Sequence, residues 1–451
     1  MDKRTLCLYF QVHQPIRLRK YHFFDIGKNS DYYDDFANRA FTRKIAECCY
    51  LPANRMLLDL IGKYGKNFKV SFSITGLAIE QFRMYAPEVI DSFKALAATG
   101  SVEFLAETYS HSLACLVDET EFKHQVKRHS DLMKELFGVK PVTFRDTELV
   151  YSDEIGEMVA NMGYTTMLTE GARHILGWKS PDYVYTNSIN PKLKLLLKNF
   201  RLSDDIAFRF SDRSWEQWPL TADKYASWLN AADGEIVNLF MDYETLGEHQ
   251  IAETGIFNFI SALPEQVFAS TNFEFLTPKE AAAKHQPIAP LHVPYPISWA
   301  DEERDLTAWL GNELQNEAFE ELYKTRSKVN AVKNEALSHD FDCLQASDHF
   351  YYMCTKLFSD GAIHQYFTPY DTPYEAFINY MNILSDFIVR VDTESQKNKV
   401  EKSKPEPKKA VEEKVTVTKK AAASKKTKVA EKVTKPAAKK STPKVSEKKK
   451  K

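Results

Sequence analysis

The sequence lacks any hydrophobic segment long enough to cross a membrane. No stretch approaches the roughly 20 apolar residues that a transmembrane helix needs. The first residues, MDKRTLCLYFQVHQP, contain a short apolar run and no small-residue cleavage site, so we expect a strand there rather than a signal peptide. The six cysteines are scattered, without the spacing of a disulfide framework or a metal site. Reduced thiols, and hence a cytoplasmic location, are expected.

The last part of the chain lacks almost everything that builds a hydrophobic core. Residues 401–451 contain no aromatic residue, Gly, Leu or Arg. Their 19 Lys and 6 Glu give a net charge of +13, whereas the preceding 400 residues carry −15. From residue 394 onward we therefore expect a disordered, Lys-rich tail. Two roles stay open for it: a solvated, solubilising segment, or weak contact with anionic polymers through counterion release.

Residues 1–290 alternate short apolar runs with longer helical patterns. Seven of these runs are interpreted as strands: TLCLYFQV, KVSFSI, SVEFLA, TFRD, TTMLTE, LKLLLKN and EIVNLFMD. Such alternation predicts an α/β fold with a parallel sheet and right-handed crossovers. About seven repeats suit a closed or nearly closed barrel, whose chemistry gathers at the carboxyl ends of the strands. After residue 300 the pattern becomes one of packed helices.

Acids and histidines follow four of the predicted strands, or lie inside them. They are His13, Gln14, Glu103, Glu107, His111, Asp146, Glu148, Asp242, Glu244, Glu248 and His249. Each has a structural alternative: a single His is often structural, Asp146 suits a helix N-cap, and Glu248 a solvated loop. Glu103 suits a buried ion pair. As a group, however, these residues predict a polar basin at the ligand-binding face of the barrel, because burying ionised carboxylates without partners costs several kcal/mol.

Two carboxylates facing one bond fit glycoside hydrolysis. One ionised carboxylate attacks the sugar while a protonated one gives its proton to the leaving oxygen, and crowding the two raises the pKa of one of them. Aromatic side chains could then offer flat faces for sugar rings. Candidates are Tyr243, Trp215, Trp218 and Trp299, although each is more often a core residue.

Five segments in this order resemble the five motifs of glycoside hydrolase family 57, the α-amylase-type group. They are HQP, GSVEF, FRDTELVYS, FMDYETLGEH and QASDHFYYM, and the resemblance extends from residue 5 to about residue 390. It implies an incomplete (β/α)7 barrel over residues 1–295 and a helical region over 296–393 that completes the active site. The tail, 394–451, lies outside the resemblance. The family acts on α-glucans with retention of configuration.

Position by position, the resemblance implies Glu148 as the nucleophile and Asp242 as the general acid/base. The implied substrate-binding residues are His13, Gln14, Glu103, Tyr243, Trp299, Asp348 and His349. Ser101 stands where the second motif often has Gln, which puts a secondary contact in doubt. The resemblance implies no metal and no cofactor.

The sequence favours an α-amylase-like hydrolase of α-1,4 bonds in α-glucans or maltooligosaccharides, and it leaves three alternatives. A 4-α-glucanotransferase or a branching enzyme on the same scaffold would share the covalent intermediate and differ in what resolves it. A metal-dependent deacetylase or mannosidase-like enzyme would need a ligand cluster that the sequence does not display. A glycan-binding protein without activity is disfavoured because both catalytic carboxylates are present.

Overall fold

The computed structural model describes residues 3–356 and 368–403. Its strands form two sheets, each dominated by parallel pairs. They are β1 (Arg4–Val12), β2 (Val70–Ile74), β3 (Val102–Phe104), β4 (Thr143–Arg145), β5 (Thr166–Glu170), β6 (Tyr185–Asn187), β7 (Lys194–Lys198), β8 (Ile236–Asp242), β9 (Phe273–Phe275) and β10 (Pro290–Leu291). Each of the seven predicted strands is therefore present, and β6, β9 and β10 are additional.

The first sheet has the order β3-β2-β1-β8, with β9 paired to the start of β1. All of its pairs are parallel, and the registers bring Gln11 opposite both Ser73 and Asp242. Apart from its first residue, β1 is buried along its whole length. A continuous apolar run without alternation is typical of a parallel strand that is covered on both faces.

The second sheet has the order β10-β6-β7-β5-β4, in which only the β6–β7 pair is antiparallel. Hydrogen bonds join it to the first sheet at two places. Ala106, after β3, pairs in parallel with Phe144 of β4, and Asn199, after β7, donates its N–H to the Asn238 carbonyl of β8 at 2.9 Å. The seven predicted strands are thus successive neighbours whose carboxyl ends lie on one side.

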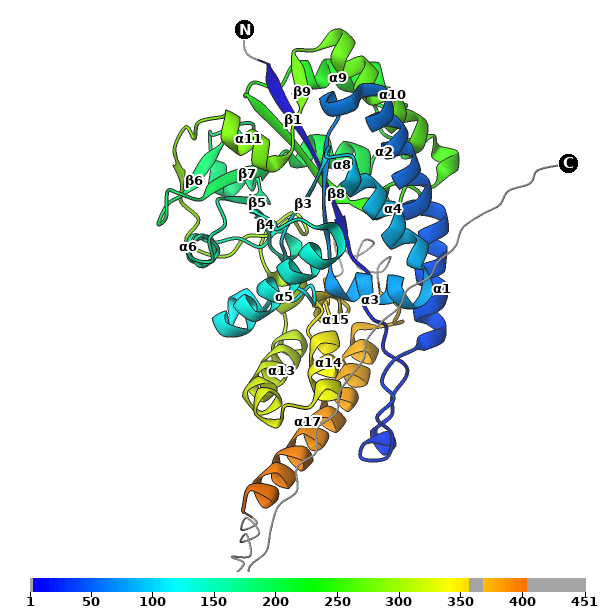
Figure 1. Cartoon of the computed structure of the whole chain (residues 1–451), viewed down its shortest axis with the longest axis vertical. Helices are drawn as coiled ribbons and strands as arrows, with labels where there is room; N and C mark the ends of the chain where they lie inside the picture. The colour runs from blue at the N-terminus through cyan, green and yellow to red at the C-terminus, as the bar shows by residue number, and fades with distance from the viewer. Residues whose placement is uncertain (1–2, 357–367, 404–451) are drawn as a thin grey trace, which may run out of the picture. The chain divides into compact units, whose positions relative to one another are not determined.

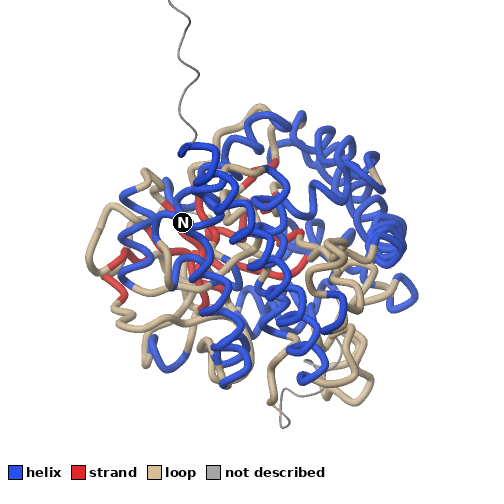
Figure 2. The backbone as a smooth tube through the Cα atoms, turned by 90° about the horizontal axis from the view of Figure 1, so that it is seen from below, coloured by secondary structure: helices blue, strands red, loops and turns tan. Residues whose placement is uncertain are grey.

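Helices cover the outside of these strands, and Figure 2 shows the strands enclosed among them. They are α1 (Asp35–Ile45), α2 (Leu51–Tyr64), α3 (Gly76–Tyr85), α4 (Pro87–Ala98), α5 (Glu119–Phe137), α6 (Asp153–Asn161), α7 (Arg173–Leu176), α8 (Phe200–Ala207), α9 (Ala222–Asn230), α10 (Ile256–Ser270) and α11 (Pro278–Lys284). For α3 and α8, a single capping residue separates the strand from the helix: Thr75 accepts from Ala78 N, and Asn199 from Leu202 N. The sequence therefore turns from strand to helix at the edge where the polar residues gather.

A helical region follows the strands, and Figure 1 shows it on the side toward which β1 runs. It contains α12 (Thr307–Leu310), α13 (Glu313–Val332), α14 (Glu335–Leu344), α15 (Ser347–Tyr351) and α17 (Pro373–Ser403). One hydrophobic core combines Phe144 of β4 with Trp309, Phe341 and Phe387 of this region. The region is therefore part of the same compact unit as the strands.

The predicted boundary of the tail needs correction, because α17 continues to Ser403 instead of ending near residue 393. The predicted disordered tail otherwise lies outside the described residues. Within residues 3–356 and 368–403, no helix is both long and apolar enough to span a bilayer. Across the same residues, no disulfide joins any of the six cysteines.

Candidate active site

Glu148 lies just after β4, at the carboxyl side of the sheet, in a strained backbone conformation. Its φ is 57° and ψ is 23°, and Leu149 beside it has φ 54°. His111, in the loop after β3, has φ 53°. Left-handed backbone at a residue other than Gly costs about 1–3 kcal/mol and persists where surrounding contacts hold it. The strain at Glu148 and His111 therefore indicates a site that the rest of the fold supports.

Three donors from different parts of the chain hold the Glu148 carboxylate. Trp299 Nε1 donates to Oε2 at 2.7 Å, while His111 Nε2 and Ser347 Oγ each lie 3.2 Å from Oε1. Burial alone would raise the pKa of Glu148, but its contacts with His111, Arg145 and Trp299 outweigh burial and lower it. Glu148 is accordingly ionised at neutral pH.

Asp242 is the last residue of β8, and its pKa is shifted in the opposite direction from that of Glu148. Burial, and secondly the negative charge of Glu148, raise the pKa of Asp242 to about 6, although Arg145 and His111 pull in the other direction. The two carboxyl groups are therefore close enough for the charge of Glu148 to shift the pKa of Asp242, and both residues are partly exposed. One is held ionised and the other retains its proton to a higher pH, which is the division that acid-assisted nucleophilic attack requires.

Two stacked histidines lie beside these carboxyl groups. The rings of His13 and His111 are 3.9 Å apart at an interplanar angle of 19°. Burial opposes the charge of His111, yet Glu107 and Glu148 raise its pKa to about 9. Burial and the neighbouring His111 lower the pKa of His13, which bonds to Thr75 Oγ1 at 2.9 Å and to Asp348 Oδ2 at 2.8 Å. At neutral pH the pair thus carries one positive charge, on His111.

Two further cations, the side chains of Arg145 and Lys198, lie over the indole ring of Trp299. Arg145 Cζ and Lys198 Nζ each lie 5.0 Å from the centroid of its ring. Lys198 also pairs with Asp204 at 3.1 Å. Arg145 is fully buried, and among the described residues its three guanidinium nitrogens have no hydrogen-bond partner; Glu107 Oε2 lies 4.0 Å away. A cation placed in this way stabilises neighbouring carboxylates without binding one of them tightly.

Comparison with known proteins identifies the family of the chain. The family model described as glycosyl hydrolase family 57 matches residues 7–294. The chain belongs to glycosyl hydrolase family 57. A protein of Methanocaldococcus jannaschii named "Putative alpha-amylase" is 44% identical over 395 residues, which cover 84% of this chain and 83% of the relative. The chain is therefore an α-amylase-like member of a glycoside hydrolase family.

Solved structures resemble the chain in fold. A branching enzyme of this family from Pyrococcus horikoshii has a TM-score of 0.60 at 11% identity, covering 88% of this chain and 95% of that one. An alpha-amylase from Thermotoga maritima has a TM-score of 0.54 at 10% identity, covering 87% and 97%. A 4-alpha-glucanotransferase from Thermococcus litoralis has a TM-score of 0.57 at 14% identity; the match covers 78% of this chain and 56% of that one.

Four of the predicted family 57 substrate-binding residues lie at or beside the carboxylate pair. His13, Asp348 and Trp299 do so through the contacts above, and Trp299 holds Glu148 with its indole N–H. Gln14 Nε2 donates to Glu244 Oε1 at 3.2 Å. Burial, and then the charge of Asp242, raise the pKa of Glu244 to about 8.

The structure does not bring the other three into this cluster. Tyr243 is fully buried in the aromatic core, where its hydroxyl donates to Asn54 Oδ1 at 2.6 Å. His349 Nε2 bonds to the Cys343 carbonyl within the helical region. Glu103 accepts from Thr143 Oγ1 at 2.6 Å and from Lys279 N at 2.9 Å, near the amino ends of β4 and α11. The hydrogen bonds of these three residues are structural ones, and their role in substrate binding stays a prediction; of the three, His349 also interacts electrostatically with Asp348 and His13.

Arg145 and Lys198 escaped the sequence analysis, and His111 and Glu107 were noticed there without a role. A signal existed for the two cations, since each directly follows an apolar residue inside a predicted strand, TFRD or LKLLLKN. A buried Arg or Lys requires anionic partners, so its presence in such a strand indicates carboxylates nearby.

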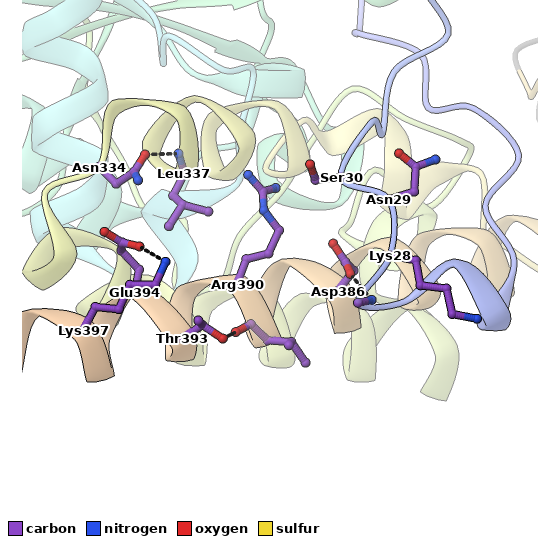
Figure 3. Close-up of a pocket in the computed structure, with 12 residues that line it drawn as sticks. Lys28, Asn29, Ser30, Asn334, Leu337, Asp386, Arg390, Thr393, Glu394 and Lys397 are labelled. Atoms are coloured by element: carbon purple, nitrogen blue, oxygen red, sulfur yellow. Dashed lines mark hydrogen bonds and ion pairs between the residues drawn. The ribbon is translucent and has the colours of Figure 1, made fainter.

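A groove of about 420 Å³ lies elsewhere, between the loop at residues 27–30 and the helices α14 and α17 (Figure 3). Its polar groups are largely used in local bonds: Asp386 accepts from Gly27 N, and Glu394 pairs with Lys397. Neither Glu148 nor Asp242 lines it. Within the described ranges, no group of three or more His, Cys, Asp or Glu has the arrangement of metal ligands.

Proposed function

We propose that this protein hydrolyses α-1,4-glucosidic bonds in α-glucans and maltooligosaccharides with retention of configuration. The single observation that carries the proposal is the geometry of two carboxyl groups: Trp299, His111 and Ser347 hold the Glu148 carboxylate just after β4, and Asp242 ends β8. Consistently, the pKa of Glu148 is lowered and that of Asp242 is raised to about 6. A retaining glycosidase needs an ionised nucleophile beside a protonated acid. The similarity to a relative named as an alpha-amylase supports the substrate class.

In the first step Asp242 gives its proton to the glycosidic oxygen while a Glu148 oxygen attacks the anomeric carbon. The bond to the leaving sugar breaks and a glycosyl ester with Glu148 forms. In the second step Asp242, now ionised, takes a proton from water, which attacks the same carbon and releases Glu148. Both carboxyl groups return to their starting states, and no other reactant is needed.

We assign His13, Gln14 and Asp348 to the binding of the sugar at the cleavage point, because each is linked to the carboxylate pair through a neighbour. His13 stacks on His111, Asp348 bonds to His13, and Gln14 bonds to Glu244. Trp299 receives a different role from the one expected, since its indole N–H orients the nucleophile. The hydrogen bonds between the two sheets support an incomplete (β/α)7 barrel as the scaffold. A cytoplasmic location stays a prediction from the cysteine pattern.

The product distribution from one defined maltooligosaccharide tests the reaction. Hydrolysis increases the number of reducing ends, whereas transfer yields longer and shorter products at a constant number. We expect Glu148→Gln and Asp242→Asn each to abolish nearly all turnover. Glu121→Gln and Asp205→Asn are matched controls, because both carboxyl groups are buried in ion pairs outside the site. Wild-type rates in either active-site variant would overturn the assignment.

Azide rescue separates the two roles. With an α-maltosyl fluoride donor, the leaving fluoride needs no acid, so Asp242→Ala should still form the glycosyl ester and release an α-glycosyl azide. Glu148→Ala cannot form that ester, and azide should occupy the place of the missing carboxylate to give the β-glycosyl azide. Exchanged anomers would reverse the assignment of nucleophile and acid/base.

A further inference from the structure

Glu107, His111 and Glu148 form a carboxylate–imidazole–carboxylate line beneath the proposed site. His111 Nε2 is 3.2 Å from Glu148 Oε1, and Nδ1 is 3.6 Å from Glu107 Oε2, an ion-pair distance longer than a hydrogen bond. The three residues come from the end of β3, the loop that follows it and the turn after β4. The sequence analysis gave the first two no function, and the two proposed catalytic steps leave both unused.

Glu107 is placed as a fixed anion. It is fully buried, and Gln11 Nε2 donates to its two oxygens at 3.1 and 3.3 Å. Its backbone N–H donates to Nδ1 of His129, so that ring carries its proton on Nε2 and donates it to the Ile74 carbonyl at 2.8 Å. His129 is therefore neutral, which leaves His111 as the imidazole beside Glu107 that carries charge.

The backbone of His111 is held as firmly as its ring. Its left-handed φ of 53° is fixed on one side by Ser347, whose N–H donates to the His111 carbonyl at 2.9 Å. The ring of His13 stacks on the ring of His111 and is itself bound to Thr75 and Asp348. Moving the His111 backbone would therefore break a contact with the helical region, and turning its imidazole would break the stack with His13.

We propose that His111 is a positioning residue whose imidazolium keeps a permanent positive charge beside the Glu148 carboxylate. Glu107, on the other side of the imidazole, stabilises that charge. The inference rests on the proposed function only in naming Glu148 as the nucleophile. Glu148 loses its negative charge when the glycosyl ester forms, and the buried His111–Glu107 pair is then electrically neutral. His111 therefore retains its proton throughout the cycle and is neither the acid nor the base.

The charged or titratable groups facing His111 all enter its titration. They are Glu107, Glu148, His13, Arg145, Asp146, Asp242 and Asp348. Of these, Arg145 and His13 oppose its protonation, and the carboxylates favour it. Replacing Glu107 removes a direct anionic partner of His111 and leaves Glu148 unchanged. Glu107→Gln therefore tests the charge of His111 without altering either proposed catalytic carboxylate.

Histidine titration by NMR tests the proposal without any substrate. In the full-length protein labelled with ¹³C-histidine, the resonance absent from His111→Gln identifies His111. We expect its midpoint near pH 9, and a decrease of about one unit or more in Glu107→Gln, the size expected of a close charge. His285→Gln is the matched control, because His285 bonds to Thr5 and Glu235 at the opposite end of β1. Its replacement should leave the titration midpoint of His111 unchanged. A wild-type midpoint near 6.5, or one unaffected by Glu107→Gln, would overturn the proposal.

The pH profile of kcat/KM on a maltooligosaccharide gives the second reading. His111→Gln should move both limbs toward higher pH, because both carboxyl groups lose a neighbouring cation, and the double variant with Glu107→Gln should move them no further. A purely structural role would lower the rate and leave the limbs in place, which contradicts the proposal. If no glucan is turned over, the proposed function fails while the NMR midpoints still decide the state of His111.

Discussion

Trp299→Phe removes one hydrogen bond from the proposed nucleophile and little else. The bond from Nε1 to Glu148 Oε2 is 2.7 Å long and ends on an ionised group. Hydrogen bonds to charged groups contribute about 1.5–3 kcal/mol. The phenyl ring of the variant can keep an aromatic face toward Arg145 and Lys198, which now lie 5.0 Å from the indole centroid. The change therefore isolates the N–H.

Losing this hydrogen bond should raise the pKa of Glu148, because the bond stabilises the ionised form. Since a pKa unit corresponds to 1.36 kcal/mol, the pKa of Glu148 should increase by about 1–2 units. The acidic limb of kcat/KM should move upward by the same amount, because the nucleophile must be ionised. The basic limb, set by Asp242, should stay in place, since an indole N–H carries no net charge. Stopped assays of reducing ends across the pH range, on one maltooligosaccharide, measure both limbs.

Trp309→Phe is the matched control for this experiment. Trp309 is buried in the helical region, and its Nε1 has no hydrogen-bond partner among the described residues. Its replacement removes an N–H that bonds to nothing there, so the profile should match that of the wild type. If the acidic limb of Trp299→Phe does not move, Trp299 does not control the ionisation of Glu148. A shift of both limbs would mean that the cations moved with the ring.

Three other predictions concern the groups around the pair and the tail. His13→Ala should lower kcat/KM more than the melting temperature, since its partners Thr75 and Asp348 lie at the site; a collapse of melting with little kinetic change would make it structural. Deleting residues 404–451, after α17 ends, should leave turnover of soluble oligosaccharides unchanged, and a large loss would contradict a passive tail. The raised pKa of His111 stabilises the fold fully below about pH 6.5, its unfolded value, and this contribution disappears as pH increases through about 9. The wild type should therefore lose more stability than His111→Gln between those pH values in chemical denaturation; parallel curves would refute it.

The seven central strands could be predicted from sequence because each is an apolar run that stops at a polar residue. β6, β9 and β10 span two or three residues each and were missed. β3 and β4 are equally short, but they were found because their predicted segments, SVEFLA and TFRD, extend beyond the three paired residues. The end of α17 was placed about ten residues too early because its last turns contain few apolar residues. Composition marks where a core ends, and a helix can continue beyond that point.

The contacts of the candidate site were harder to predict from the sequence than the strands, because they join distant parts of the chain. Trp299 and Glu148 are 151 positions apart, and neither sequence neighbourhood reveals the bond between them. Tyr243 lies in the core for a local reason: it begins the 3-10 turn after β8, which directs the side chain following Asp242 inward. Glu103 lies three residues before the point where Ala106 bridges to β4, too early along its strand to reach the carboxyl edge.

The different behaviour of the two carboxyl groups follows from where the donors sit. His111 and Trp299 contact Glu148 directly, whereas Arg145, His111 and Lys198 act on Asp242 only through space. Direct donors stabilise a carboxylate more than distant charges do, and once Glu148 is ionised its own charge raises the pKa of Asp242. A sugar that displaces water from this space strengthens both effects, because the local dielectric constant falls. In the proposed mechanism, substrate binding thereby favours the protonated form of Asp242 when the glycosidic oxygen needs its proton.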